Sequence, residues 1–181
     1  MVMNLLPQDV LVMLKLAVSP DPWWTYATIA HELGVSSSMA FSSVKRATQA
    51  RLYNTHEKRP RRKALEEFLV HGVKYAFPPE VGAITRGIPT AFAASRFKEE
   101  FGPFGEDPEI YVWPHPTGEH RGMALSPLYK SVPEAVENDL ALYDILAVLD
   151  AIRIGRAREQ RHAEDLIREM LSHAPAAQPA H

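Results

Sequence analysis

Residues 25–46, which read TYATIAHELGVSSSMAFSSVKR, decide the fold of this chain. Thr25 is expected to be the N-cap of a helix over 26–33, because its hydroxyl can accept a hydrogen bond from the first turn. Gly34 should end that helix with a positive φ, and Ser36 should cap the helix that follows. A helix, a short glycine-containing turn and a second capped helix predict a helix-turn-helix.

The pattern small–Ile–Ala–x–x–Leu–Gly–Val–Ser within this stretch resembles the winged helix-turn-helix of bacterial transcriptional regulators such as the MarR family. The resemblance covers roughly residues 8–55. It implies a DNA-binding fold, and it points to no particular effector. The alternative is a pair of helices used only for packing, as in winged helices that serve as scaffolds.

The helix after the turn is expected to run from Ser36 to about residue 51 and to be the recognition helix. Such a helix enters the major groove by its N-terminal end, where small polar side chains allow close approach and the helix dipole favours a phosphate. Its apolar residues include Phe41 and Val44. Because no lysine or arginine precedes Lys45, direct recognition of bases should be modest. The expected DNA-contacting residues of this helix are Ser36, Ser37, Ser38, Ser42, Lys45, Arg46 and Gln49.

Residues 44–63 carry eight basic side chains and one acidic one, a charge of +7 in a chain whose net charge is −2. A local basic patch on an acidic protein attracts polyanions. Four of these residues are expected to contact DNA phosphates at the tip of a wing or at the start of the next helix: Arg59, Arg61, Arg62 and Lys63. The alternative is a solvated charged loop, which the position directly after a helix-turn-helix pattern disfavours.

A wing is expected after the recognition helix. Residues 52–54 fit its first strand, whereas 55–63 are too polar and basic for a strand. A helix is predicted over 61–71, closed by Gly72, and 73–77 reads as a strand that ends at two prolines. We therefore expect a helix inserted between the two wing strands, which departs from the MarR pattern.

The secondary structure of the flanking segments is predicted from the spacing of apolar residues and from the positions of prolines and glycines. A first helix is expected over 5–18, because its apolar residues recur at helical spacing. Nine prolines and six glycines in 78–133 predict loops with short elements. The elements expected there are a helix over 90–101 and strands at 110–113 and 123–125.

A long helix predicted over 134–155 is apolar on more than one face, so more than one neighbour should cover it. In a small chain the simplest second cover is a partner subunit, and we therefore expect a homodimer. Residues 156–171 should form a charged, exposed helix, and the tail 172–181 has no reason to order. The expected dimerisation residues are Leu142, Ile145, Leu146, Leu149 and Ile152.

These assignments predict a mainly α fold with a small β component, divided into four parts. Residues 1–77 are the winged helix-turn-helix, 78–133 pack on it, 134–171 are the helical dimerisation region and 172–181 are a disordered tail. No segment is apolar over the roughly 20 residues that a membrane span needs, and the start lacks the features of a signal peptide. A cytoplasmic protein with no membrane partner is expected.

The sequence contains no pattern that predicts catalysis, a metal site or a cofactor. The chain has no cysteine and eight histidines, and His115 and His120 lack the spacing of a metal site. Phosphate-binding glycine loops and nucleophile motifs are absent from the sequence. Aromatic residues within 75–113, together with Arg86 and Arg121, fit either a ligand pocket or a small aromatic core, and the core is the preferred interpretation.

The predicted function is that of a sequence-specific transcriptional regulator, a homodimeric repressor whose partner is double-stranded DNA. A second hypothesis is a protein-interaction module. The winged helix followed by an Arg86-Gly-Ile-Pro-Thr segment and a helical end resembles the antitoxins of bacterial abortive-infection systems. Those proteins repress their own operon and pair with a nucleotidyltransferase toxin. A third hypothesis is a structural winged helix in a larger assembly, with no DNA contact.

Overall fold

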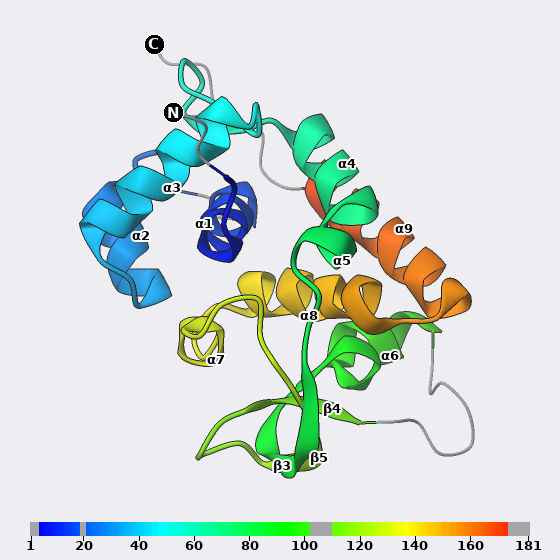
Figure 1. Cartoon of the computed structure of the whole chain (residues 1–181). Coiled ribbons are helices and arrows are strands. Elements are labelled where there is room, and N and C mark those ends of the chain that lie inside the picture. The colour runs from blue at the N-terminus through cyan, green and yellow to red at the C-terminus, as the bar shows by residue number, and fades with distance from the viewer. Residues whose placement is uncertain (1–3, 19–20, 102–109, 174–181) are drawn as a thin grey trace.

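The computed structural model describes residues 4–18, 21–101 and 110–173. Figure 1 shows one long helix across the middle of the molecule, with most of the other helices above it and the main sheet below it. The predicted class, mainly α with a small β component, is confirmed.

Three helices open the chain: α1 (Pro7–Val18), α2 (Tyr26–Leu33) and α3 (Ser37–Gln49). All three agree with the sequence prediction, and α2 begins and ends at the predicted residues. Residues 9–17 of α1 are all buried. Because α1 contacts both α2 and α3, it is the support on which the other two helices are held.

The turn between α2 and α3 is fixed by the capping residues that the sequence predicts. The Thr25 hydroxyl accepts a hydrogen bond from the Thr28 amide at 3.1 Å, and the Ser36 hydroxyl accepts one from the Met39 amide at 3.1 Å. Gly34 has a φ of 64°, a left-handed conformation that would strain any residue with a side chain. A short turn of defined backbone geometry therefore joins α2 to α3.

A two-stranded hairpin follows α3, in which β1 (Tyr53–Asn54) pairs antiparallel with β2 (Arg59–Pro60). The prediction that 55–63 contains no strand is therefore wrong. So short a hairpin is held by backbone hydrogen bonds and does not need an apolar run. Of its four paired residues, only Tyr53 and Pro60 are buried.

The next helix, α4 (Arg62–His71), begins directly after the hairpin, so the expected insertion of a helix between the wing strands is also wrong. The expected strand at 73–77 is instead a single helical turn, α5 (Val73–Ala76). This turn buries Val73 and leaves Tyr75 77% exposed. A strand would have placed both side chains on the same face.

The main sheet has three strands: β3 (Val81–Thr90), β4 (Tyr111–Pro114) and β5 (His120–Leu125). β3 pairs antiparallel with both of the others, and β4 pairs parallel with β5. The strands predicted at 110–113 and 123–125 correspond to β4 and β5. The sequence does not predict β3, because two glycines and a proline interrupt it and such residues weaken a strand.

The helix predicted over 90–101 forms as two pieces, the 3₁₀ helix η1 (Ala91–Ala93) and α6 (Ser95–Phe101). Ala94 separates them with an extended backbone, φ −68° and ψ 145°. The helix predicted over 134–155 is divided as well.

Two helices, α7 (Val132–Ala135) and α8 (Leu140–Ile154), occupy most of 134–155. The Asp139 carboxylate accepts a hydrogen bond from the Leu142 amide at 3.0 Å. A carboxylate in this position is an N-cap, so α8 begins as a new helix and does not continue α7.

The last helix, α9 (Ala157–His173), packs beside α8 and α4. Its buried residues are Ala163, Leu166, Ile167 and Leu171. The prediction of an exposed helix is therefore wrong for this face. α9 includes the first two residues of the expected tail at 172–181, and 174–181 lie outside the described residues.

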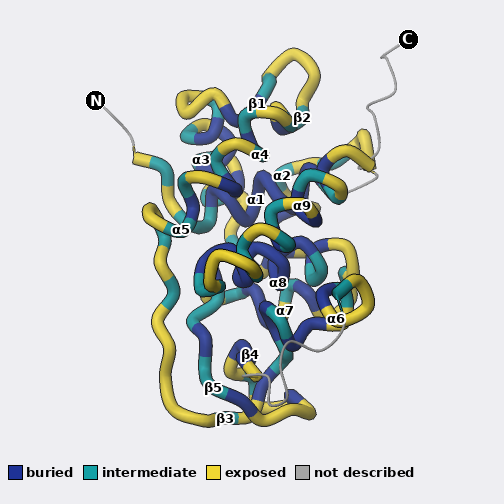
Figure 2. The backbone as a smooth tube through the Cα atoms, turned by 90° about the vertical axis from the view of Figure 1, so that its right-hand side faces the viewer, coloured by how far each residue is buried: buried dark blue, intermediate teal, exposed yellow. Residues whose placement is uncertain are grey.

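α8 is the centre of a core that the single chain builds by itself. It contacts α1, α5, α6, α9, η1 and β3, and Figure 2 shows it largely buried inside the molecule. The residues expected to join two subunits are each at most 2% exposed within one chain: Leu142, Ile145, Leu146, Leu149 and Ile152. The dimer seam predicted on them is therefore wrong, because the sheet and the neighbouring helices supply the second cover of α8.

A buried carboxylate connects the main sheet to α8. Asp150 is 1% exposed, and one of its oxygens accepts hydrogen bonds from Trp113 Nε1 at 2.6 Å and from Thr90 Oγ1 at 2.8 Å. Its other oxygen accepts one from the Arg153 guanidinium at 2.7 Å. Burial raises the pKa of Asp150, and these donors stabilise the carboxylate in the interior.

Candidate nucleic-acid interface

The residues of α3 divide into a buried face and an exposed face. The buried residues, on the side that packs against α1 and α2, are Ala40, Ser43, Val44 and Ala47. The opposite face, here called the α3 stripe, consists of Ser38, Ser42, Lys45 and Gln49. Ser42 is half-buried and the other three residues are exposed. The stripe therefore presents two short hydroxyls, one positive charge and one amide.

Three serines lie at the start of α3, as the sequence predicts, and Ser36, Ser37 and Ser38 are all exposed. The Ser36 hydroxyl caps the helix and lies 3.1 Å from the Ser38 hydroxyl. The helix start is thus ordered by its own serines while their side chains stay at the surface. Free amides in the first turn of a helix of this length attract anions.

Arg46 lies outside the α3 stripe, which corrects its assignment as a DNA-contacting residue. Its Nε donates to Asp9 Oδ2 at 2.8 Å, and its Nη2 donates to Asp9 Oδ1 at 2.7 Å. Asp9 is fully buried in α1, and the hydrogen bonds to it raise the pKa of Arg46. This guanidinium holds α3 against α1.

Basic residues surround the hairpin and the start of α4. The Arg59 Nε donates to Glu57 Oε2 at 2.6 Å, so the hairpin itself offsets the charge of this arginine. Arg62 is half-buried at the first position of α4. Arg51, just before the hairpin, is exposed. Three further exposed residues are here called the hairpin basic cluster: Lys58, Arg61 and Lys63.

Four aromatic rings connect the start of α2, the α3 stripe and the hairpin. Phe41, beside the stripe, is 53% exposed, and its ring centroid lies 5.4 Å from that of Tyr26. Trp24 lies 5.3 Å from Tyr26 and 6.5 Å from Tyr53 of β1. The Trp24 Nε1 also donates to the Lys58 carbonyl at 3.1 Å. The structure therefore places the α3 stripe and the hairpin basic cluster on neighbouring parts of the surface.

The exposure of Phe41 follows from the structure, because spacing along α3 does not decide it. Phe41 lies four residues after Ser37 and four residues before Lys45, both of which are exposed. Residues four apart share a helix face. Residues three apart share a face as well, so the same rule also places Phe41 near the buried Val44, with which it was grouped as an apolar residue.

Lys130 is a basic residue near the start of α3 that the sequence does not predict. The loop before α7 lies against the α2–α3 turn, where the Tyr129 hydroxyl donates to Met39 Sδ at 3.5 Å. A Cβ on Gly34 would lie 3.5 Å from the Cβ of Ser131. Lys130, between the two loop residues, is exposed. No local pattern reveals this neighbourhood, because Met39 and Tyr129 are 90 positions apart.

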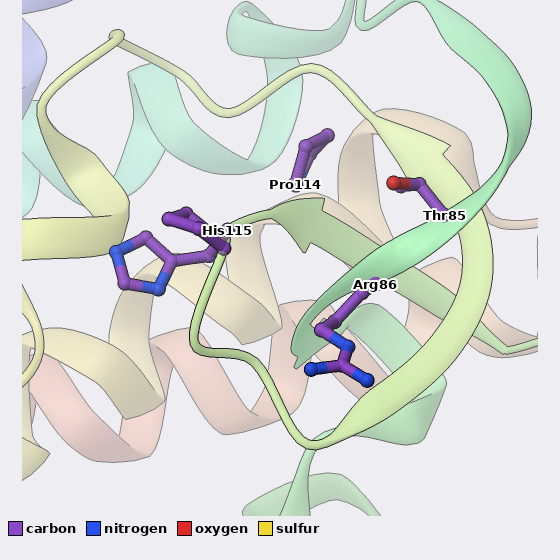
Figure 3. Close-up of a pocket in the computed structure, with 5 residues that line it drawn as sticks. Thr85, Arg86, Pro114 and His115 are labelled. Atoms are coloured by element: carbon purple, nitrogen blue, oxygen red, sulfur yellow. The ribbon is translucent and has the colours of Figure 1, made fainter.

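An open hollow of about 460 Å³ lies at the main sheet, lined by Thr85, Arg86, Pro114, His115 and Pro116. Figure 3 shows the side chains of Arg86 and His115 pointing in different directions, so they do not converge on one ligand. Trp113 and Tyr111 are buried, which favours the small aromatic core over an aromatic ligand pocket. Among the described residues, no three His, Cys, Asp or Glu side chains are arranged to hold a metal ion.

Comparisons of the chain with protein-family models, with curated proteins and with solved structures find no match. Within 4–18, 21–101 and 110–173, no helix is both long and apolar enough to cross a bilayer. The functional assignment therefore depends on the geometry of the α3 stripe, the hairpin basic cluster and the aromatic rings beside them.

Proposed function

We propose that this protein binds double-stranded DNA and regulates transcription, with α2, the Gly34 turn, α3 and the β1–β2 hairpin acting as a winged helix-turn-helix. The observation that carries the proposal is the α3 stripe, an exposed helix face of short polar side chains and one lysine that lies near a basic hairpin. Small residues on such a face let the helix backbone come close to the bases of the major groove.

The parts of this surface have different roles in the proposal. Ser38 and Ser42 face the base edges, and Lys45 contacts a base or a phosphate farther along the groove. The hairpin basic cluster and Lys130 contact phosphates, which fix the register of a protein on DNA and carry no sequence information. Arg59 contributes less than the sequence predicts, because it is paired with Glu57.

The homodimeric repressor remains part of the proposal, without a seam on α8. A two-fold dimer would place two copies of α3 in successive major grooves, about 34–36 Å apart, and would require a palindromic site. Sedimentation of the protein with and without a palindromic duplex measures the stoichiometry. A one-to-one complex would exclude the dimer and leave DNA binding in place.

The experiment that tests DNA binding begins with selection of bound duplexes from a pool with a randomised centre. Fluorescence anisotropy then compares a selected duplex with a scrambled one across a salt series. We expect the selected duplex to bind tenfold tighter or more, about 1.4 kcal/mol. Equal, salt-dependent affinity for both would exclude a sequence-specific regulator, and no binding at low salt would refute DNA binding altogether.

Partner binding is a second candidate function, favoured by the first half of β3. Residues 81–86 pair with β5, and the side chains of Val81 and Ile84 are 54% and 67% exposed. Among the described residues β4 pairs only with 87–90 of β3, so the other edge of 81–86 is unpaired, and another protein can add a strand to such an edge. Co-expression with the product of a neighbouring gene tests this antitoxin-like function: Ile84→Lys should release the partner, and Lys45→Ala should retain it.

A further inference from the structure

We propose that Phe41 is the side chain with which α3 recognises thymine, by packing its ring against the 5-methyl group in the major groove. This inference rests on the proposed DNA-binding function and adds to it a specificity-determining residue. It follows from three observations: the exposure of the ring, the way in which the ring is held, and the donors that α3 lacks.

Phe41 is the large apolar group beside a stripe of small polar ones. It is 53% exposed, and Ser38 and Ser42 lie three residues before it and one residue after it. Because the serine side chains are short, the phenyl ring extends farther from the helix axis than they do. In a groove contact the ring, at the side of the stripe, would reach a base next to those that face the serine hydroxyls.

The ring of Phe41 packs against Tyr26, which in turn packs against Trp24. Tyr26 meets it edge to face, with an angle of 75° between the ring planes, and Trp24 meets Tyr26 in the same way at 84°. Trp24 is in turn hydrogen-bonded to the carbonyl of Lys58 in the hairpin. A side chain already fixed in position loses little conformational freedom when it binds, so this packing prepares Phe41 for contact.

The α3 stripe offers few of the donors with which proteins read guanine or adenine. Arg46, the arginine of α3, is occupied by Asp9, and Gln49 is the last residue of α3, away from the end that enters the groove. Thymine differs from the other bases in presenting a methyl group in the major groove, and phenylalanine is one of the side chains that contact it. Lys45 remains as a donor for guanine farther along the groove, so it is at the N-terminal end of α3, around Phe41, that the composition favours thymine.

The test uses the full-length protein and a duplex selected from the randomised pool. Each thymine in the recognised site is replaced in turn by deoxyuridine, which lacks only the methyl group. We expect at least one replacement to weaken binding by the wild-type protein about fourfold, the equilibrium factor for burying one methyl group. Phe41→Ala should bind the thymine and deoxyuridine duplexes equally.

Two further variants separate this effect from misfolding and from general loss of aromatic surface. Phe41→Leu keeps an apolar side chain and should retain part of the preference for thymine. Tyr75→Ala removes an exposed ring from α5, and this variant should retain the full preference for thymine. If the wild-type protein ignores the replacement, or if Phe41→Ala keeps the preference, the inference is overturned while DNA binding stands. If no duplex binds, both proposals fail.

Discussion

Arg46 of α3 and Asp9 of α1 form an ion pair with two hydrogen bonds, of 2.8 and 2.7 Å. Asp9 Oδ2 also accepts a hydrogen bond from the Leu6 amide at 2.8 Å, at the start of α1. A single buried carboxylate therefore caps one helix and positions another. The residue that fixes the proposed recognition helix against α1 is thus one that the sequence predicted to contact DNA.

Replacing Arg46 with alanine should destabilise the fold. The substitution leaves the buried Asp9 carboxylate without its cation, and we expect the free energy of unfolding to fall by about 3–5 kcal/mol. Urea unfolding followed by circular dichroism measures this change. Lys45→Ala, at the neighbouring exposed position, should change it by less than about 0.5 kcal/mol. If Arg46→Ala keeps wild-type stability and loses only DNA affinity, Arg46 contacts DNA and its assignment to the fold is wrong.

Leu146→Asp should unfold the chain and should not produce a folded monomer. Leu146 is 2% exposed in the core of the single chain, so an aspartate there would be a buried, unpaired charge, which costs several kcal/mol. Leu140→Asp is the matched control, because Leu140 is 72% exposed on the same helix, and it should fold normally. If Leu146→Asp has a native circular dichroism spectrum and half the wild-type mass in solution, the predicted dimer seam on α8 is correct.

The elements that the sequence predicts correctly are those whose signals are local. Thr25, Gly34 and Ser36 set the ends of α2 and α3 through hydrogen bonds and a φ value that involve residues at most a few positions away. Such signals depend little on contacts with distant parts of the chain. The first three helices and the turn between two of them could therefore be placed before the structure was known.

Two of the wrong predictions, the dimer seam and the role of Arg46, depend on contacts between residues distant in sequence. An apolar helix such as α8 needs a second cover, and the sequence does not say whether this comes from β3 of the same chain or from another subunit. The role of Arg46 depends in the same way on Asp9, which is 37 positions away. In the candidate site, the positions of the serines and of the hairpin basic residues were predictable from the sequence. The pairing of Arg46 with Asp9 and the position of Lys130 near α3 were not.

Removing charge from the hairpin basic cluster should weaken DNA binding in a salt-dependent way. Arg61 is exposed directly before α4, and its replacement by alanine should lower the slope of log K against log salt by about 0.9 if one phosphate contact is lost. The loss should be equal for selected and scrambled duplexes, because phosphates carry no sequence. Lys98→Ala removes an exposed lysine from α6 and should leave the slope unchanged. Equal slopes for all three proteins would exclude Arg61 from the interface.

Alkaline unfolding should report on Tyr143. Its hydroxyl donates to the Pro89 carbonyl at 2.8 Å, and burial raises the pKa of Tyr143 from 10.0 to about 12. In the unfolded chain this phenol loses its proton from about pH 10, whereas the folded protein retains it for about two more pH units. Since the folded-state pKa is the higher one, the stabilising contribution is complete below pH 10 and is lost as the pH rises to 12.

Tyr143→Phe has no proton to lose at this position, and it also lacks the hydrogen bond to Pro89. We expect it to be less stable than the wild type by about 1 kcal/mol at pH 8. Between pH 10 and pH 12 the free energy of unfolding of the variant should fall by about 2 kcal/mol less than that of the wild type. Burial raises the pKa of Tyr53 as well, so part of the alkaline decline remains in both proteins. Urea midpoints measured at pH 8 and at several values above pH 10 give the two curves. Parallel curves would show that Tyr143 has no part in the alkaline transition.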